Sequence, residues 1–374
     1  MESWVSLLAA DPKPWLLASD EPAARWITLT QLLGRSADDP QVVGARAAVL
    51  EDPLTRELIG RLPDWEVDNE VSGHSSPKFA PNLLNLLADM GLQGGDDPRV
   101  DAVLQQMLRH QDAAGRFAAY SRSGHGNTGR LPEPVWGTTL CDTHAITDVL
   151  VRFGLGADER TRSALRCMAE DRIATAQGEA WPCIPHSVTG FRGPGRKADF
   201  CPMVTVEALR AFAWLPDSVR PPGLHASART ALRAWRVRSE EKPYMMGHGY
   251  QFKVIKWPAF WYNIFWMLDT LGRYPELWSE PGAAPEDRQA LAEMCACLIA
   301  YNFNGDGQVV PQSCYKGFEA FSFGQKKQPS PFATATLAAV LARFDALTEE
   351  IRAVDIRRLG SSKGGTGVPL PPRA

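Results

Sequence analysis

Hydrophobic residues recur with helical spacing along most of this chain, in segments about as long as one helix. Each is strongly apolar, and together they cover residues 24–33, 79–90, 145–153, 204–215, 261–271 and 332–344. Four of the six are followed directly or within a residue by glycine, at Gly34, Gly91, Gly154 and Gly272. Glycine closes a helix easily because it enters the left-handed backbone conformation without steric cost. The pattern therefore predicts a helix at each segment.

More amphipathic helical segments lie between the apolar ones, at 40–59, 98–110, 159–174, 225–239 and 285–301. A short loop joins each apolar segment to its amphipathic neighbour, which is typical of helical hairpins. We expect the apolar helices to form an inner layer and the amphipathic helices an outer layer. This alternation favours an all-α fold that closes into an (α/α)6 toroid (barrel), with 308–310 as the only strand candidate.

No Ser- or Pro-rich linker divides the alternating helices, so the sequence predicts a single domain over residues 1–359. Residues 360–374 differ, because they are rich in Gly, Ser and Pro and contain no aromatic residue. Such a composition predicts a disordered C-terminal tail.

One stretch, residues 107–154, carries a recognisable motif. Gln111, Gly115 and Phe117 follow the spacing Q-x-x-x-G-x-W/F, after one helix and before a loop into the next. A degraded version occupies 304–309. The motif resembles the repeat of the terpene cyclase and protein prenyltransferase (squalene cyclase-type) superfamily, whose fold is an (α/α)6 toroid. The resemblance implies a central cavity, lined by loops and inner-helix N-termini, that takes an isoprenoid substrate.

The tetrad Cys141-Asp142-Thr143-His144 stands where the third apolar helix begins. In the cyclases that the chain resembles, a D-x-D-D motif protonates an alkene; that motif is absent here, and Asp142 is the one acidic residue at a comparable place. A carboxyl group desolvated among aromatic residues has a raised pKa and can donate a proton. We therefore consider Asp142 and His144 as catalytic residues, with His144 orienting the acid. The alternative is that Asp142 caps the helix.

Aromatic and basic residues near the other inner-helix starts are candidates for substrate binding. The aromatic candidates, which suit an apolar ligand or a carbocation, are Trp136, Tyr250, Phe260, Trp261, Tyr262 and Tyr315. The basic candidates, which suit a diphosphate, are Arg192, Arg196, Lys197 and Lys256. The alternatives are aromatic residues that fill a core and solvated charges on loops.

Cysteine and histidine side chains at the third and fourth helix entrances suggest a metal. Cys141, Cys183, His186 and Cys201 are of the types that zinc prefers, and prenyltransferases of the resembled superfamily hold zinc with Asp, Cys and His. The family spacing is not reproduced, so the cofactor is zinc or none. The seven cysteines contain no CxxC pair and do not predict a disulfide framework.

The composition of the chain excludes some classes of partner but does not indicate a reaction. A net charge of -3 and a pI near 6.2 give no reason to expect nucleic acid as a partner. No apolar run is long enough for a membrane span, no signal peptide is evident, and we expect a cytoplasmic protein. The first functional hypothesis is an isoprenoid-handling enzyme resembling terpene cyclases or prenyltransferases. The alternatives are a non-catalytic toroid that binds a small molecule or a partner, and a zinc-dependent enzyme.

Overall fold

The computed structural model describes residues 3–67, 74, 76–121, 133–191, 201–241, 249–279 and 282–359. Contacts divide the chain into two compact units. Unit 1 contains Met1–Arg56, Asp89–Gly91 and Ala234–Ala374, and unit 2 contains Glu57–Ala88 and Leu92–Arg233. The single domain over 1–359 stays a prediction, and each unit is described by itself. The expected tail, 360–374, lies outside the described residues.

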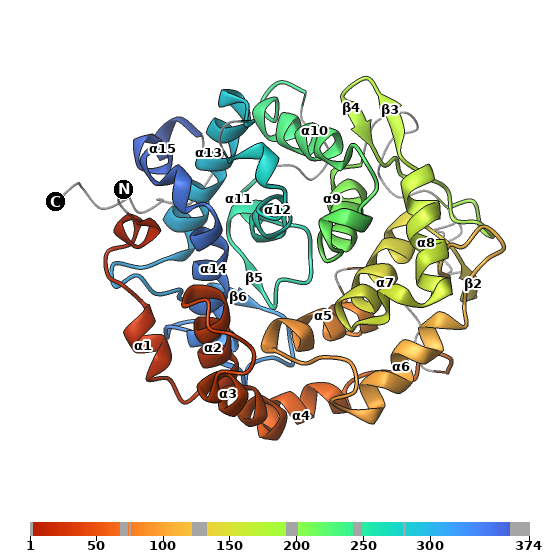
Figure 1. The fold of residues 1–374 in the computed structure, drawn as a ribbon, viewed down its shortest axis with the longest axis horizontal. Coiled ribbons are helices and arrows are strands. Elements are labelled where there is room, and N and C mark those ends of the chain that lie inside the picture. Colours follow the sequence, from red (N-terminus) through yellow and green to blue (C-terminus); the bar gives the residue numbers. More distant parts are fainter. Residues whose placement is uncertain are drawn as a thin grey trace. The chain divides into compact units, whose positions relative to one another are not determined.

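The described part of unit 2 consists of helices and two small antiparallel strand pairs (Figure 1). Its helices are α5 (Ala80–Met90), α6 (Pro98–Leu108), α7 (Leu140–Arg152), η3 (Leu155–Ala157), α8 (Glu159–Glu170), α9 (Pro202–Ala213), η4 (Asp217–Val219) and α10 (Leu224–Arg236). The last residues of α5 and α10 belong to unit 1. The strand β1 (Ala119–Ser121) pairs with β2 (Val135–Gly137), and β3 (Ile173–Thr175) pairs with β4 (Gly178–Ala180). The chain is thus mainly helical here, as the hydrophobic pattern predicts.

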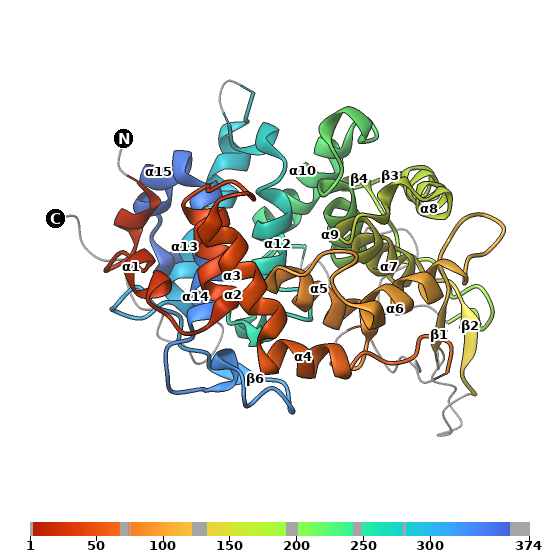
Figure 2. The same ribbon diagram turned by 60° about the horizontal axis from the view of Figure 1, so that its bottom comes forward.

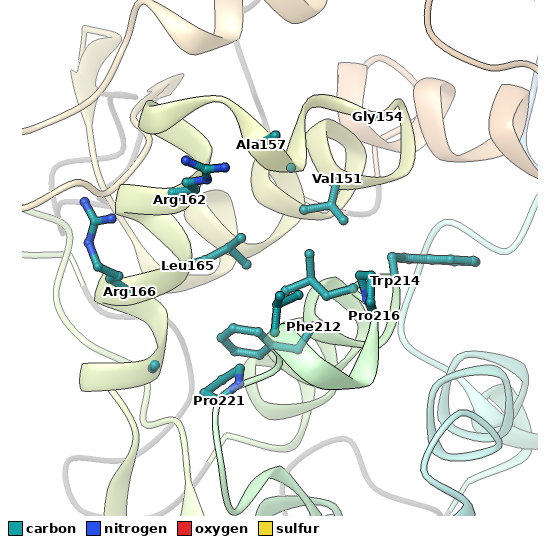
Figure 3. A pocket seen from close by; sticks show the side chains of 14 residues that line it. Val151, Gly154, Ala157, Arg162, Leu165, Arg166, Phe212, Trp214, Pro216 and Pro221 are labelled. Atoms are coloured by element: carbon teal, nitrogen blue, oxygen red, sulfur yellow. The ribbon is translucent and has the colours of Figure 1, made fainter.

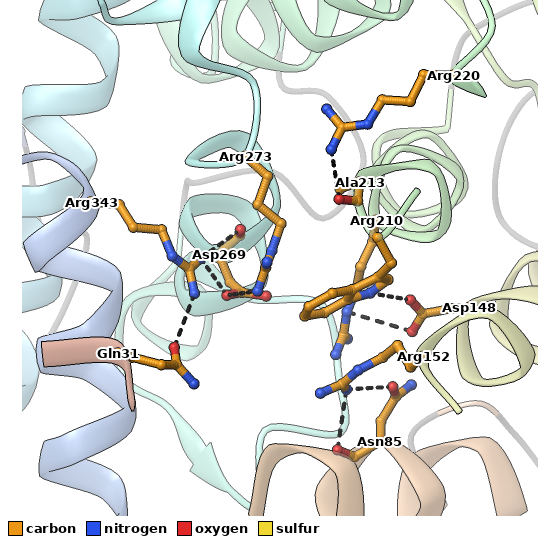
Figure 4. A network of polar contacts seen from close by, with 11 residues as sticks. Gln31, Asn85, Asp148, Arg152, Arg210, Ala213, Arg220, Asp269, Arg273 and Arg343 are labelled. Carbon is orange, nitrogen blue, oxygen red and sulfur yellow. Dashed lines mark hydrogen bonds and ion pairs between the residues drawn. The ribbon is translucent and has the colours of Figure 1, made fainter. Parts of the chain in front are cut away.

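Two buried helices, α7 and α9, run side by side in the same direction and form the centre of unit 2. Near their N-termini, the His144 Nδ1 lies 3.1 Å from the carbonyl oxygen of Val204. Further along, Asp148 on α7 accepts a 2.8 Å hydrogen bond from the Trp214 indole and faces Arg210, whose Nε lies 3.5 Å away (Figure 4). These contacts fix the register of the two helices.

Unit 1 brings the first and last described helices together. Its helices are η1 (Trp4–Leu7), α1 (Lys13–Leu17), α2 (Pro22–Ile27), the π-helical turn η2 (Thr28–Leu32), α3 (Pro40–Glu51), α11 (Tyr250–Lys253), α12 (Ile264–Leu271), η5 (Pro275–Leu277), α13 (Pro285–Asn302), η6 (Ser322–Gly324), α14 (Pro331–Arg343), η7 (Asp345–Leu347), α15 (Thr348–Ala353) and η8 (Ile356–Leu359). Strand β5 (Lys256–Trp257) pairs with β6 (Ser313–Cys314) in parallel.

Helix α2 packs against α14 (Figure 2). The Trp4 amide donates to Asp345 at 2.6 Å, and Arg352 donates to the Ser6 hydroxyl at 2.6 Å. The Arg343 guanidinium on α14 lies 2.6 Å from Asp269 on α12, which also faces Arg273 (Figure 4). Helix α13 differs from its expected amphipathic character, because it is buried almost along its whole length and packs against α15 as well as α12.

The helix ends follow the sequence signals in part. Gly34, Gly91 and Gly154 adopt positive φ, as expected of glycines that close helices. Gly272 does not, since its φ of -63° is helical. It lies close to the Phe344 ring, where an added Cβ would be 3.1 Å from the ring atom Cζ. The expected single helix at 40–59 is broken into α3 and α4 (Pro53–Gly60), because the residue before Pro53 is forced out of the helical conformation. The strand expected at 308–310 is one bridge, between Phe303 and Val309.

A particular turn explains the motif at Gln111. In that turn the Asp112 carboxylate accepts from the amides of Ala114 and Arg116, at 3.0 and 2.9 Å. The Gln111 side chain donates to the carbonyl oxygens of Gly115 and of Arg160 on α8, at 2.7 and 2.8 Å. The motif therefore fastens a turn to the next amphipathic helix.

The degraded version in unit 1 repeats the hydrogen bonds of Asp112 but not those of the Gln111 side chain, because Phe303 stands at the position of Gln111. There the Asn304 side-chain oxygen accepts from the amides of Asp306 and Gln308, at 2.9 Å each. Gly307 has positive φ, like Gly115 in the first copy. The turn is a repeat in three dimensions even where its letters have changed.

Replacing Gly115 with Ala is expected to lower the free energy of unfolding by more than about 1 kcal/mol, because an L side chain is strained at its φ of 98°. An added Cβ would also lie 2.5 Å from the Ser163 hydroxyl and 3.1 Å from its carbonyl oxygen. Gly44, inside helix α3 with open space around it, is the control: Gly44→Ala should stabilise by about 0.5–1 kcal/mol. Urea denaturation of both variants measures the difference, and equal stabilities would contradict this account of the turn.

Among the helices of the described ranges, none combines the length and the hydrophobicity that crossing a membrane requires.

Candidate active site

Ionisable side chains gather in unit 2 around the first turns of α7 and α9 and the segment that precedes α5. The N-cap of α7 is Thr139, whose hydroxyl accepts from the Asp142 amide at 3.2 Å and donates to the Asp142 carboxylate at 2.7 Å. The alternative that Asp142 caps the helix is therefore wrong, because Thr139 is the N-cap. Asp142 lies in the first turn, where the helix dipole favours a negative charge.

The partner of the Asp142 carboxylate is His74, a residue that the sequence pattern did not single out. Its Nε2 lies 3.1 Å from the Asp142 carboxylate. The Asn82 side chain on α5 holds the backbone before that helix by donating to the His74 carbonyl oxygen at 2.6 Å. Two stretches of unit 2 that are distant in sequence, the segment leading into α5 and the first turn of α7, thus meet here.

The charges of this pair differ from the sequence expectation. Burial raises the pKa of Asp142, but the attraction and hydrogen bond of His74 and the hydrogen bond of Thr139 outweigh it, so the pKa is lowered. Burial lowers the pKa of His74, but Cys141 and Asp142 together bring it well above its usual value. Asp142 is a carboxylate beside an imidazolium, and the expectation of a raised pKa for Asp142 is corrected.

Glu207 is the buried acid that the structure supplies instead. It lies on α9, with 5% of its surface exposed, and its Oε2 has no hydrogen-bond partner among the described residues. Burial raises its pKa to about 8, with further contributions from Asp142 and Asp148. At neutral pH, Glu207 is an uncharged carboxylic acid. It lies close enough to Asp142 and His74 for the charge of each to shift its pKa, upward for Asp142 and downward for His74.

Cys141 and His186 complete the cluster. The partly exposed Cys141 thiol lies 3.2 Å from the Thr139 hydroxyl and within hydrogen-bonding reach of His74. His186 lies over Gly137, where a Cβ would be 2.1 Å from its Cε1, so only glycine leaves room for the ring. Its Nδ1 accepts from the amide of Thr189 at 3.2 Å, which places the proton on Nε2, a buried atom with no partner among the described residues.

His144 does not orient Asp142. Its ring is fully buried, its Nδ1 is bonded to Val204, and burial lowers its pKa to about 4. It is a neutral imidazole that connects α7 to α9, and the expected catalytic pair Asp142–His144 is replaced by the contact between Asp142 and His74.

Several buried polar atoms of this region have no hydrogen-bond partner in the described structure: His74 Nδ1, His144 Nε2, His186 Nε2 and Glu207 Oε2. A buried polar atom without a partner costs about 1–3 kcal/mol, so such atoms are uncommon unless a ligand, an ion or catalysis uses them. Their concentration around α7 and α9 marks this region as the candidate site.

The expected zinc ligands are only loosely grouped. Cys141, Cys183, His186 and Cys201 all lie in unit 2, but among the described residues no group of three or more His, Cys, Asp and Glu side chains is arranged to hold a metal ion. Burial also raises the pKa of the Cys201 thiol to about 12. The structure forms no disulfide at any of the seven cysteines.

The aromatic candidates are distributed over both units. Trp136 is in unit 2, where it stacks on His110 with ring centroids 3.6 Å apart. The others belong to unit 1. There, Phe260 and Tyr262 are buried, Tyr250 is 38% exposed, and Phe260 packs against Tyr315 with a centroid distance of 5.5 Å.

Trp261 is partly exposed, and the exposed Lys256 places its Nζ 3.9 Å from the centre of the Tyr315 ring. In the described structure these residues form core and surface aromatic contacts within unit 1. The basic candidates Arg192, Arg196 and Lys197 lie outside the described residues.

Two signals in the sequence point to the residues that were missed. Glu207 is the one carboxyl group in the mostly apolar segment 204–215, and a carboxyl group buried there is either paired with a positive charge or neutral. His74 precedes the apolar segment 79–90, as Asp142 opens the next one. If the N-termini of the inner helices converge, His74 and Asp142 lie at the same site.

The sequence matches no protein-family model and none of the curated proteins with which it was compared.

Proposed function

We propose that the chain is an enzyme that uses Glu207 as a general acid and Asp142 as a fixed carboxylate, acting on an apolar, isoprenoid-like substrate. One observation carries this proposal: two buried carboxyl groups on adjacent helices have pKa values shifted in opposite directions. Two such carboxyl groups, one protonated and one ionised at neutral pH, are the arrangement by which enzymes divide acid and electrostatic roles. The pKa of Glu207, about 8, also lies near a neutral working pH, where a general acid is most effective.

The chemistry that suits these groups is cleavage of a carbon–oxygen bond. As the bond breaks, its electron pair goes to the oxygen, which takes the proton of Glu207. The positive charge that develops on carbon faces the Asp142 carboxylate, which Thr139 and His74 hold in place. The Glu207 carboxylate then removes a proton from the neighbouring carbon, so that an alkene forms and the acid is regenerated. Because the protonated oxygen group leaves and an alkene forms, this is a lyase reaction.

A weak acid of this kind argues against direct protonation of an alkene, which needs a far stronger acid. The isoprenoid substrate rests on the resemblance of the Gln111–Phe117 turn to the cyclase and prenyltransferase repeat. The same resemblance supports the closure of the helices into an (α/α)6 toroid, which we propose as the architecture around this site.

The test uses farnesyl diphosphate and farnesol with the purified protein, and detects hydrocarbon products by gas chromatography and mass spectrometry. Glu207→Gln and Asp142→Asn are each expected to lower the rate by at least about 100-fold, because each removes one of the two roles. The wild-type rate should fall as the pH rises above about 8, where Glu207 loses its proton.

The matched control is Glu170→Gln, which removes an exposed carboxylate from α8 and should leave the rate unchanged. Full activity in Glu207→Gln would remove Glu207 from the mechanism. No product from either substrate with the wild-type protein would exclude this isoprenoid class.

A further inference from the structure

A second feature of unit 2 lies at the other end of its central helices. A cavity of about 610 Å³ opens between α8, the C-terminal end of α7 and the segment that follows α9 (Figure 3). Val151 lines it, and along α7 this residue is roughly 14 Å from Asp142, at 1.5 Å per residue. The cavity is therefore separate from the candidate active site, and its volume is in the range that binds small molecules.

The walls of the cavity are mostly apolar. Leu165 on α8 faces Phe212 on α9 (Figure 3). Leu215, which follows the C-cap of α9, also lines the cavity. Val219 on η4 also lines the cavity and is 61% exposed. Exposed apolar side chains around a hollow commonly mark a binding surface.

The wall formed by residues 212–219 is braced in place. Arg220 donates to the carbonyl oxygens of Ala213 and Leu215, at 2.8 and 3.0 Å, and so satisfies the end of α9. The Trp214 indole is held by Asp148, and the Arg152 guanidinium lies 4.5 Å from the centre of its ring. A preformed wall lowers the entropic cost of ligand binding.

Positive charge lies along one edge of this cavity. Arg162 and Arg166 are one helical turn apart on α8, and both are among the residues that line the cavity (Figure 3). Both guanidiniums face a single carboxylate, Glu159, at 3.9 and 3.0 Å. Two cations that share one anion leave a net positive charge at the edge of an apolar cavity.

We propose that this cavity binds a single-chain amphiphile, whose hydrocarbon chain lies between Leu165 and Phe212 and whose anionic head group, a carboxylate or a phosphate, meets Arg162 and Arg166. The apolar walls and the paired guanidiniums are complementary to the two ends of such a molecule. This inference is independent of the reaction proposed at Glu207.

The experiment measures binding of palmitate, hexadecyl phosphate and hexadecanol to the full chain by isothermal titration calorimetry. The double variant Arg162→Gln/Arg166→Gln should weaken the two anionic ligands by about tenfold or more and leave hexadecanol unchanged. Glu159→Gln should tighten the anionic ligands, because it releases both guanidiniums. The relative affinities of palmitate and hexadecyl phosphate identify the preferred head group.

A third variant tests the apolar part. Ala169→Trp places a large ring on the half-buried face of α8 that lines the cavity, and it should abolish binding of all three ligands while circular dichroism stays unchanged. Absence of saturable binding of palmitate and hexadecyl phosphate by the wild-type protein would overturn the proposal. Binding that neither the arginine variant nor Ala169→Trp alters would also overturn it.

Discussion

At pH 8, the Glu207→Gln variant is expected to be several kcal/mol more stable than the wild-type protein, even though it loses a functional group. The ordinary pKa of Glu207 is 4.5 and burial raises it to about 8 in the folded state. Between these values the folded protein keeps a proton that the unfolded chain releases. The contribution of Glu207 to stability must then fall by about 1.4 kcal/mol for each pH unit, and above pH 8 its loss is complete.

Urea denaturation of both proteins at several pH values between 5 and 8 measures this slope. Glutamine does not titrate, so the stability of Glu207→Gln should depend less on pH than that of the wild-type protein. His74 adds a loss in the same direction above its ordinary pKa of 6.5, because its pKa is also raised. His144, whose pKa is lowered to about 4, gives a gain up to about pH 6.5, and both parts should remain in the variant. Asp142 adds nothing in this window, since its lowered pKa matters only near and below its ordinary value of 3.8. Parallel pH dependences of the two proteins would show that Glu207 is not a neutral acid in the folded state.

The second large effect is expected at Asp148, a buried carboxylate on α7. Replacing it with Ala leaves the Arg210 guanidinium without that carboxylate and the Trp214 indole without its acceptor. Removing one partner of a buried ion pair destabilises proteins by about 3–5 kcal/mol, because the remaining charge stays buried. The free energy of unfolding of Asp148→Ala should fall by an amount in this range.

Two further variants separate charge from packing in that pair. Asp148→Asn retains an acceptor for the indole and should cost less than Asp148→Ala. The double variant Asp148→Leu/Arg210→Met removes both charges together, and it should recover most of the lost stability. If Asp148→Ala were as stable as the wild-type protein, the pair would not hold α7 against α9.

The positions of the main helices could be predicted from hydrophobic spacing, because a buried helix needs apolar residues on most of its surface. The segments 79–90, 204–215 and 332–344 correspond to α5, α9 and α14 with small shifts at the ends. The break at Pro53 was also present in the sequence, but the long apolar spacing across it favoured one helix. The short strands were missed because each has two or three residues, too few to show an alternating pattern.

The candidate site could be predicted only in part. Asp142 was found because a polar tetrad opens an apolar helix, but its protonation state depends on His74, which is 68 residues earlier in the chain. Sequence spacing cannot show which histidine reaches the carboxylate, and the one closer in sequence, His144, bonds to Val204 instead. Glu207 was missed because burial, which the residue type does not reveal, keeps its carboxyl group protonated at neutral pH.

The hydrogen bonds between Trp4 and Asp345 and between Ser6 and Arg352 have a consequence for the order of folding during synthesis. Unit 1 needs segments from both sides of unit 2 in the chain, whereas unit 2 is nearly continuous, interrupted only at Asp89–Gly91. The ribosome therefore completes unit 2 while the later part of unit 1 is still untranslated. Helices α1 to α3 must wait for α14 and α15, and during that interval their apolar faces depend on other proteins or on one another for protection from aggregation.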